Sequence, residues 1–269
     1  MAEQLIFVKL LDGKTAVIYG AAGGIGSGVA KAFAKEGATV FLTGRTMAPL
    51  ESLAEQISEA GGTAEVASVD ALDPKSVEEH LQKLVASKGK LDVSFNLIGT
   101  NVAMGRSLSE LSDEQFVRAT YARVTSYFVT MTSAARIMEK QGKGVILGLT
   151  TPNSRLPMPK MGGFVIAGAA IEALCRQLAL EVGPKGVRVV CLRTGGTPDN
   201  PVLQEVYAYL AKIRGTTREE VEKAEGERTA LKRIPLVAEV ANAAVVMASD
   251  YASAITATTV NASGGEVVD

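Results

Sequence analysis

The residues from Gly20 to Gly26 have the spacing of a turn that binds a phosphate through its backbone. They read Gly-Ala-Ala-Gly-Gly-Ile-Gly, follow the apolar run Thr15–Tyr19 and precede an apolar helical pattern. Glycines at these spacings allow a tight turn, let a pyrophosphate approach the main chain and place the anion at a helix N-terminus. Because the motif joins a strand pattern to a helix pattern, it predicts a dinucleotide-binding turn rather than an ordinary loop.

The end of the second apolar run, Thr39–Thr43, predicts which dinucleotide is bound. A site selective for the non-phosphorylated cofactor usually has a carboxylate here, on the ribose hydroxyls. This chain has Gly44, Arg45 and Thr46 instead. A guanidinium binds a 2′-phosphate that a carboxylate would repel, so the sequence predicts NADP(H) in preference to NAD(H). The alternative is an ordinary surface arginine after a strand.

Alternating strand and helix patterns must position these residues. Expected strands cover Thr15–Tyr19, Thr39–Thr43, Ala64–Val69, Leu91–Leu97, Gly144–Leu149, Val187–Leu192 and Thr258–Asn261. Expected helices cover Ile25–Lys35, Pro49–Ala60, Ser76–Ser87, Asp113–Lys140, Ala167–Val182 and Val237–Ser249. The strands are nearly continuous apolar runs, as in parallel sheets buried on both faces. The pattern predicts an α/β fold, a Rossmann-like doubly wound parallel sheet of about seven strands with helices on both faces.

We expect one domain over residues 1–269, because no linker, repeat or low-complexity tract divides the chain. Residues 198–235 interrupt the alternation: they are rich in charge and contain Thr-Thr-Arg-Glu-Glu, which resembles a helix capping box. This segment follows the sixth strand, at the edge of the sheet where binding loops gather. It predicts a lid-like helical insertion, and the alternative is a solvated helix pair.

Composition excludes several kinds of partner. The formal net charge of −1 gives no basic field for nucleic acid or an anionic membrane. We find no run of the roughly 18 apolar residues that a membrane span requires, and no signal-peptide pattern. The single histidine, His80, is expected at the surface, and Cys175 and Cys191 are too few and too distant for a zinc site. We therefore expect a metal-free, cytoplasmic protein with core thiols that acts on a small molecule.

Over nearly its whole length the chain resembles the short-chain dehydrogenase/reductase family. The resemblance rests on Gly20-x-x-x-Gly24-Ile-Gly26, Ser68-Val-Asp-Ala71, Asn96-Leu-Ile-Gly99, Gly183-Pro-Lys-Gly-Val-Arg-Val-Val and the stretch from Leu231-Lys-Arg-Ile-Pro to Asn261-Ala-Ser-Gly-Gly265. Tyr19 stands where a threonine is usual, and Arg193-Thr194-Gly195 stands where Pro-Gly is usual. Together with the glycine turn and the arginine, the resemblance implies cofactor contacts from Gly20, Ala22, Gly23, Gly24, Ile25, Gly26, Gly44, Arg45, Thr46, Asp70, Ala71, Asn96, Ile98, Gly99, Gly195 and Thr197.

The catalytic residues of that family are largely missing from this sequence. In the family, a tyrosine donates a proton to the carbonyl oxygen, a serine hydrogen-bonds that oxygen, a lysine lowers the tyrosine pKa and holds the ribose, and an asparagine supports a water relay. Counting back from Glu181-Val182-Gly183 places Phe164 and Gly168 at the tyrosine and lysine positions. Thr151 falls at the serine position and Arg123 at the asparagine position. We therefore expect Thr151 and Arg123 as the remaining catalytic candidates, beside a roomy, apolar wall.

Three functions remain open at this point. The first is an atypical NADP(H)-dependent oxidoreductase that transfers hydride to or from a small organic substrate, with a proton from water, the substrate or Lys160. The second is a non-redox isomerase, lyase or cyclase that uses Arg123 and Thr151 as electrophilic groups. The third is a non-catalytic NADP(H)-binding protein. For Arg123 alone, an ion pair at an interface is the alternative.

The resemblance also implies self-association. The family is usually dimeric or tetrameric and pairs its long fourth and fifth helices. The expected helix over Ala167–Ala179 is rich in small residues, which suits close helix packing. We expect a homodimer or homotetramer.

Overall fold

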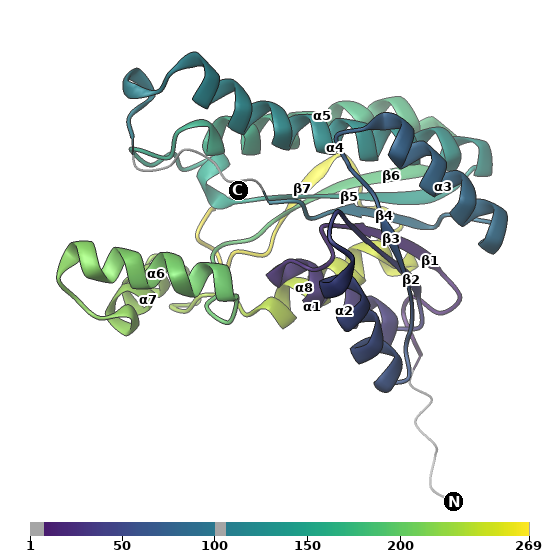
Figure 1. Cartoon of the computed structure of the whole chain (residues 1–269), viewed down its shortest axis with the longest axis horizontal. Coiled ribbons are helices and arrows are strands. Elements are labelled where there is room, and N and C mark those ends of the chain that lie inside the picture. Colours follow the sequence, from purple (N-terminus) through teal and green to yellow (C-terminus); the bar gives the residue numbers. More distant parts are fainter. Residues whose placement is uncertain (1–7, 100–105, 269) are drawn as a thin grey trace, which may run out of the picture.

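The structure is a computed structural model that describes residues 8–99 and 106–268. Over these residues seven parallel strands form one sheet in the order β3-β2-β1-β4-β5-β6-β7 (Figure 1). The strands are β1 (Thr15–Tyr19), β2 (Thr39–Gly44), β3 (Thr63–Ser68), β4 (Val93–Asn96), β5 (Gly144–Thr150), β6 (Val187–Arg193) and β7 (Thr258–Asn261). The predicted fold class and each of the seven expected strands are confirmed, with ends that agree or differ by at most two residues.

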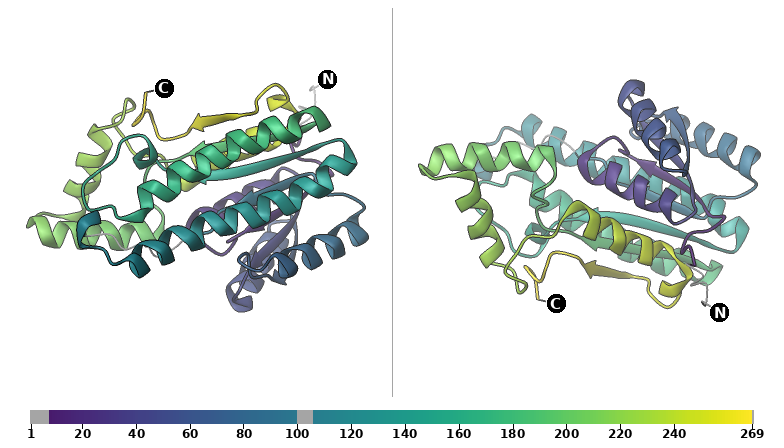
Figure 2. Two further views of the ribbon diagram at one scale, coloured as in Figure 1. Left: turned by 90° about the horizontal axis from the view of Figure 1, so that it is seen from above. Right: turned by 90° about the horizontal axis from the view of Figure 1, so that it is seen from below.

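Helices cover both faces of the sheet. The helices are α1 (Gly24–Lys35), α2 (Met47–Glu59), α3 (Pro74–Lys88), α4 (Asp113–Gln141), α5 (Gly163–Val182), α6 (Pro201–Arg214), α7 (Arg218–Glu227) and α8 (Val237–Ala248). Figure 2 shows α3, α4 and α5 over one face, and α1, α2 and α8 over the other. The two helix layers lie on opposite faces because the right-handed crossovers run in opposite directions on either side of β1.

Strand β1 shows why the expected strands are apolar throughout. Its Ala16 and Ile18 belong to the core cluster that contains Phe33 of α1, whereas Val17 and Tyr19 belong to the cluster on the opposite face. Because successive side chains of a strand point to opposite faces, a strand covered on both sides needs apolar residues at every position.

Helix α5 is strongly apolar. With the turn that follows it, the segment Gly163–Lys185 is long and apolar enough to cross a membrane by length and composition, although Glu172, Arg176 and Glu181 interrupt its apolar residues. In the structure Ile171, Cys175 and Leu178 of this helix are buried in the core. Packing against the sheet and α4 therefore accounts for the apolar residues on this side of the helix.

Residues 198–235 form α6 and α7, which lie beyond the edge at which the strands end (Figure 1). Asn200 caps α6, since its side chain accepts a hydrogen bond from the Val202 amide at 3.1 Å. Thr217 and Glu220 form a capping box at the start of α7, as the sequence predicted. The two helices share a small apolar cluster of their own around Tyr207 and Val221.

Candidate functional site

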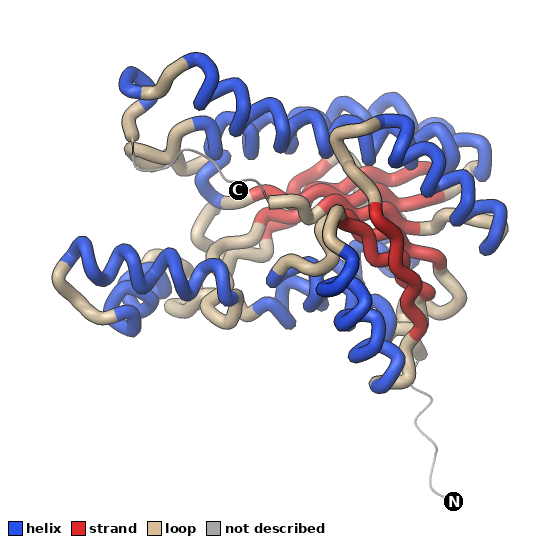
Figure 3. Tube along the Cα trace, in the orientation of Figure 1, coloured by secondary structure: helices blue, strands red, loops and turns tan. Residues whose placement is uncertain are grey.

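The structure contains a cavity of about 540 Å³ at the carboxyl ends of β1 to β4. Here β1 pairs with β2 on one side and with β4 on the other, so the crossovers leave β1 in opposite directions and open a crevice. Figure 3 shows the loops that follow the strands gathered at this edge. The cavity is lined by Gly20, Gly23, Gly44, Arg45, Val69, Asp70, Ala71, Leu72, Leu97, Ile98, Gly99, Arg118, Ala122 and Ser126.

The glycine turn needs its glycines for close backbone packing. Gly20 has φ +75°, and a Cβ there would lie 3.1 Å from the backbone of Ile98 at the end of β4. A Cβ at Gly26 would overlap the carbonyl oxygen of Gly20. Gly24 and Ile25 begin α1 directly after the turn, so the free amides of that helix lie where the sequence analysis expected an anion.

Arg45 lies at the junction of two cavities. A second cavity, of about 230 Å³, adjoins the first and is lined by residues of the glycine turn together with Thr43, Thr46, Pro49 and Leu50. The Arg45 side chain borders both, is exposed to solvent and has no ion-pair or hydrogen-bond partner within residues 8–99 and 106–268. A guanidinium in this position is free to bind an anionic group that occupies either cavity.

Two further cofactor candidates end neighbouring strands. Asp70 lines the cavity after β3, and its carboxylate accepts a hydrogen bond from the Leu72 amide at 3.0 Å. Asn96 is buried and does not line the cavity. Its amide group bonds the Thr130 hydroxyl and the Ile98 backbone, each at 2.9 Å, which fixes the end of β4 against α4.

Gly195 and Thr197 lie after β6 and line neither cavity. Thr197 is buried, and a Cβ at Gly195 would lie 3.1 Å from a carboxylate oxygen of Glu266. Burial raises the pKa of Glu266. The structure thus brings Gly195 close to an ionisable group that the sequence analysis did not consider.

One wall of the larger cavity was missed by the sequence analysis. Arg118, Ala122 and Ser126 line it from α4. Their spacing of four residues places them on one helix face, and this spacing is the signal that was available in the sequence. Arg118 is exposed, so the cavity carries a second cation besides Arg45.

Arg123 and Phe164 contact each other. The central carbon of the Arg123 guanidinium lies 4.6 Å from the centroid of the Phe164 ring. The arginine is only 5% exposed, and its Nε is buried without a hydrogen-bond partner in the part of the chain that the structure describes. Helix α5 begins at Gly163, four residues earlier than predicted, because Gly162 turns the chain at φ +53°. Phe164 therefore lies in the first helical turn, facing α4.

Two side chains lie next to Gly168, one at the end of β5 and one in the turn that follows it. A Cβ at Gly168 would lie 3.2 Å from the Thr150 hydroxyl and 3.5 Å from Cβ of Ser154. The Thr150 hydroxyl also donates to the Gly168 carbonyl at 3.3 Å. A larger residue at position 168 would require the Thr150 hydroxyl to shift by a few tenths of an ångström. Thr151, the catalytic candidate, follows directly as a half-buried residue at the end of β5.

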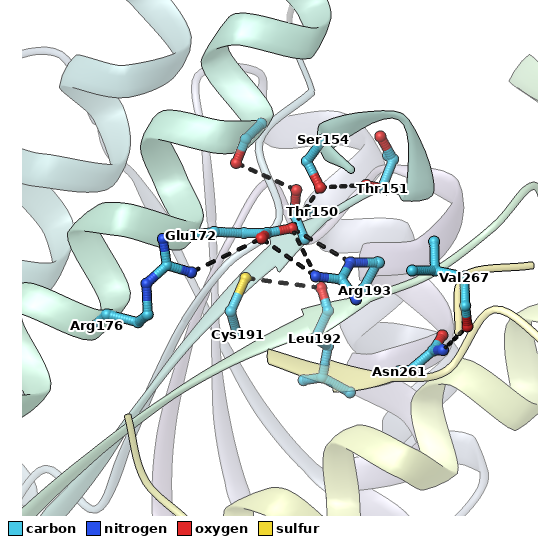
Figure 4. A network of polar contacts seen from close by, with 11 residues as sticks. Thr150, Thr151, Ser154, Glu172, Arg176, Cys191, Leu192, Arg193, Asn261 and Val267 are labelled. Carbon is cyan, nitrogen blue, oxygen red and sulfur yellow. Dashed lines mark hydrogen bonds and ion pairs between the residues drawn. The ribbon is translucent and has the colours of Figure 1, made fainter. Parts of the chain in front are cut away.

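A buried ion pair lies one turn further along α5 (Figure 4). Glu172 and Arg193 are both almost fully buried, with Nη2 of Arg193 at 3.2 Å from each carboxylate oxygen. The Ser154 hydroxyl, in the turn after β5, donates to the same carboxylate, and Arg176 lies 3.9 Å away. The pair joins the end of β6, α5 and the turn that carries Thr151. In the sequence, the available sign of this ion pair was Arg193-Thr194-Gly195, which stands where Pro-Gly is usual.

The end of α7 contacts two other segments near the strand ends. The Arg228 guanidinium lies 3.9 Å from the sulfur of Met158, in the loop between β5 and α5. It also lies 3.6 Å from Glu266, in the C-terminal segment. Lys160 in the same loop is exposed, with φ +65°.

Comparisons with known proteins agree with this geometry. A family model described as Enoyl-(Acyl carrier protein) reductase matches residues 20–266. The chain is 27% identical to a 7alpha-hydroxysteroid dehydrogenase of Clostridium sardiniense, covering 96% of this chain and 95% of the relative. It is 30% identical to a short-chain dehydrogenase/reductase of Armillaria gallica, covering 96% and 97%.

Solved structures show the same fold. NAD+-bound xylitol dehydrogenase superposes with a TM-score of 0.87 at 23% identity, covering 95% of this chain and 99% of that one. An actinorhodin polyketide ketoreductase with NADPH superposes with a TM-score of 0.86 at 23% identity, covering 94% and 97%.

Proposed function

The chain belongs to the short-chain dehydrogenase/reductase family, and from this premise we propose that it is an atypical NADP(H)-dependent oxidoreductase. It transfers hydride to or from a small organic substrate without a tyrosine proton donor. The names of its relatives, dehydrogenases and oxidoreductases, support an NAD(P)-dependent oxidoreductase. The observation that carries the proposal is the cavity at the ends of β1 to β4, whose walls combine the glycine turn with Asp70 and Arg45.

The residues present fit a dinucleotide. The backbone of the glycine turn and the first amides of α1 would hold the pyrophosphate, because side chains there would block its approach. Asp70 would contact the adenine, and Arg45 would bind a 2′-phosphate. Bound NADPH supplies the hydride. Solved relatives carry NAD+ in one case and NADPH in the other, so our preference for NADP(H) depends on Arg45.

The missing tyrosine argues for particular acceptors. Phe164 has no ionisable proton, and the Arg123 guanidinium keeps its charge at any working pH. Reduction of an activated carbon–carbon double bond or an imine depends less on a tyrosine acid than ketone reduction does. Hydride adds to the electrophilic carbon, and a proton from water adds to the neighbouring carbon or nitrogen. The description of the matching family model, an enoyl reductase, supports a carbon–carbon double bond as the hydride acceptor.

Arg123 and Thr151 would stabilise charge on the substrate during that step. A guanidinium can polarise an oxygen or bind an anionic group, and a threonine hydroxyl can donate a hydrogen bond. We further propose that α6 and α7 act as a lid. Arg228 contacts both Met158 and Glu266, so the end of α7 already joins segments on two sides of the strand ends.

The test of the cofactor is a fluorescence titration of the purified protein with NADPH and NADH. A guanidinium–phosphate hydrogen bond contributes about 1.5–3 kcal/mol, so Arg45→Ala is expected to weaken NADPH binding by roughly 10- to 100-fold. NADH binding should change little. Arg136→Ala is the matched control, because Arg136 is an exposed arginine paired with Glu78 at 2.8 Å, away from the cavity. No binding of either dinucleotide would overturn the proposal.

A second candidate is a non-redox isomerase, lyase or cyclase, which the phenylalanine and glycine at positions 164 and 168 favour. Such an enzyme would turn over equally well with the oxidised and the reduced cofactor. The two candidates are distinguished with NADPH that carries deuterium at the nicotinamide C4. Transfer of this deuterium to an activated alkene or imine would identify the protein as an oxidoreductase. Cofactor binding that changes self-association without any turnover would indicate the non-catalytic alternative.

A further inference from the structure

Two polar atoms on one face of α4 are buried without hydrogen-bond partners. They are Nε of Arg123 and the hydroxyl oxygen of Thr120, and neither has a partner among residues 8–99 and 106–268. Residues three apart on a helix share a face. Both side chains face the first turn of α5: a Cβ at Gly163 would lie 2.6 Å from the Thr120 hydroxyl, and Phe164 lies under the Arg123 guanidinium.

The Arg123 guanidinium has no ion-pair partner within residues 8–99 and 106–268. Moving a guanidinium out of water is costly unless an anion or hydrogen bonds replace its hydration. Contact with the Phe164 ring recovers part of that cost. The ring lies against the guanidinium, whose Nε has no hydrogen-bond partner within residues 8–99 and 106–268.

Neighbouring carboxylates do not serve as that counter-ion. Glu172, which follows Phe164 by eight residues on α5, is bound by Arg193 and by the Ser154 hydroxyl. Glu266 lies beside Arg228. The nicotinamide and its ribose carry no negative charge, so NADP(H) bound as proposed above brings its phosphates to the glycine turn and Arg45 rather than to α5. With no ion pair to Arg123 within residues 8–99 and 106–268, a substrate anion can supply the missing negative charge at this place.

We infer that Arg123, together with Thr120, binds a carboxylate group of the substrate. This inference rests on the proposed function, because it assigns the substrate class of the same site. A carboxylate matches the planar, forked donors of a guanidinium, and a hydroxyl can add a third donor. The substrate is therefore an unsaturated or imino acid, held by its carboxylate between α4 and α5. In the ligand-free protein this buried charge lowers the free energy of unfolding, and the substrate carboxylate compensates the charge when it binds.

The test compares crotonate with crotonamide, which have nearly the same shape and differ in charge. Binding of each is measured by isothermal titration calorimetry and by ligand-observed NMR, with and without saturating NADPH. The wild type is expected to bind crotonate at least about tenfold more tightly than crotonamide. Arg123→Met should remove this difference, and Thr120→Val should reduce it several-fold. Arg136→Met, on the exposed face of the same helix, should keep it.

A second measurement guards against misfolding of the variants. Because Arg123→Met removes a buried charge without a counter-ion, its melting temperature without ligand should equal or exceed that of the wild type. Equal binding of crotonate and crotonamide, no detectable binding of crotonate, or a preference that survives Arg123→Met would each overturn the inference. Failure of the proposed function is seen separately, as loss of NADPH binding or of deuterium transfer in the same preparation.

Discussion

At the scale of single residues, the side chains at the proposed catalytic positions lie close to one another or to their neighbours. Arg123 packs on Phe164, and a Cβ at Gly168 would lie 3.2 Å from the Thr150 hydroxyl and 3.5 Å from Cβ of Ser154. Ser154 in turn contacts the buried Glu172, which is paired with Arg193. A side chain at position 168 would require the Thr150 hydroxyl to shift by a few tenths of an ångström. We propose that Phe164 and Gly168 stand at the family's tyrosine and lysine positions, and on that assignment several side chains that contact one another differ from the family pattern together.

The pair of Glu172 and Arg193 gives the first prediction. Glu172→Leu or Arg193→Met leaves one buried charge without its partner, so each should lower the free energy of unfolding by about 3–5 kcal/mol. The double variant Glu172→Leu/Arg193→Met should lose much less than the sum of the two. Urea denaturation of all four proteins measures the coupling. Additive losses would mean that the two side chains do not stabilise each other.

His80 gives a prediction about pH. It is half-buried rather than at the surface as expected, with its ring 6.0 Å from that of Phe41. Burial and, to a smaller extent, Lys83 lower its pKa to about 4. Between pH 6.5 and 4 the unfolded chain takes up a proton that the native protein does not, so the free energy of unfolding should fall as pH falls, on the order of 3 kcal/mol in total.

The imidazole of His80 can be observed alone, because the chain has one histidine. A proton NMR titration should give a pKa near 4 in the native protein. His80→Phe should remove the corresponding part of the pH dependence of stability. A native pKa close to 6.5, or an unchanged pH dependence in the variant, would contradict the burial of this ring.

At the scale of elements, the contact between α4 and α5 determines the shape of the site. Gly163 lets the first turn of α5 approach Thr120, and the positive φ of Gly162 places the start of the helix there. This contact puts Phe164 under Arg123. The ion pair of Glu172 and Arg193 then holds the other end of the site, where β6 and the turn after β5 meet α5.

Gly163→Ala tests how close the two helices are. At an uncrowded helix position, this change stabilises a protein by roughly 0.5–1 kcal/mol. Here the added methyl group meets the Thr120 hydroxyl, so we expect a loss of about 1–3 kcal/mol instead. In a Thr120→Ala background the same change should be stabilising. Thermal and urea unfolding give both values, and a gain in the wild-type background would show that the helices are further apart.

At the scale of the whole molecule, α4 exposes an apolar stripe. Val117, Tyr121 and Phe128 are each more than half exposed, and their spacing places them on one side of the helix. Ile166 and Leu180 are exposed on α5 beside it. Apolar side chains gathered over two adjoining helices are typical of a surface that another chain covers. This stripe supports the predicted homodimer or homotetramer.

Sedimentation velocity tests this prediction. The wild type should sediment as a dimer or tetramer, and Phe128→Glu should shift it toward the monomer because the change places a charge in the interface. Tyr209→Glu is the control, since Tyr209 is an exposed aromatic residue on α6, away from the stripe. A monomeric wild type would show that the prediction of self-association is wrong, and an unchanged Phe128→Glu variant would place the interface elsewhere.

The sequence by itself determined the fold and the place of the nucleotide cavity. Apolar runs of strand length, separated by helical patterns, leave few ways to bury their side chains other than a parallel sheet covered on both faces. The glycine turn and Arg45 follow successive strands, and parallel strands end at the same edge. Local sequence was therefore sufficient to bring Gly20, Arg45 and Asp70 to one cavity.

Only the tertiary structure decided how the site is filled around α5. In the sequence, the contacting residues Arg123 and Phe164 are separated by 41 positions, and Glu172 and Arg193 by 21 positions. Contacts between residues on different elements depend on helix packing and on the exact start of α5, neither of which a local pattern specifies. The close contact at Gly168 and the buried Nε of Arg123, which has no hydrogen-bond partner within residues 8–99 and 106–268, follow from that packing. The partial burial of His80 follows from another tertiary contact, that of α3 with Phe41.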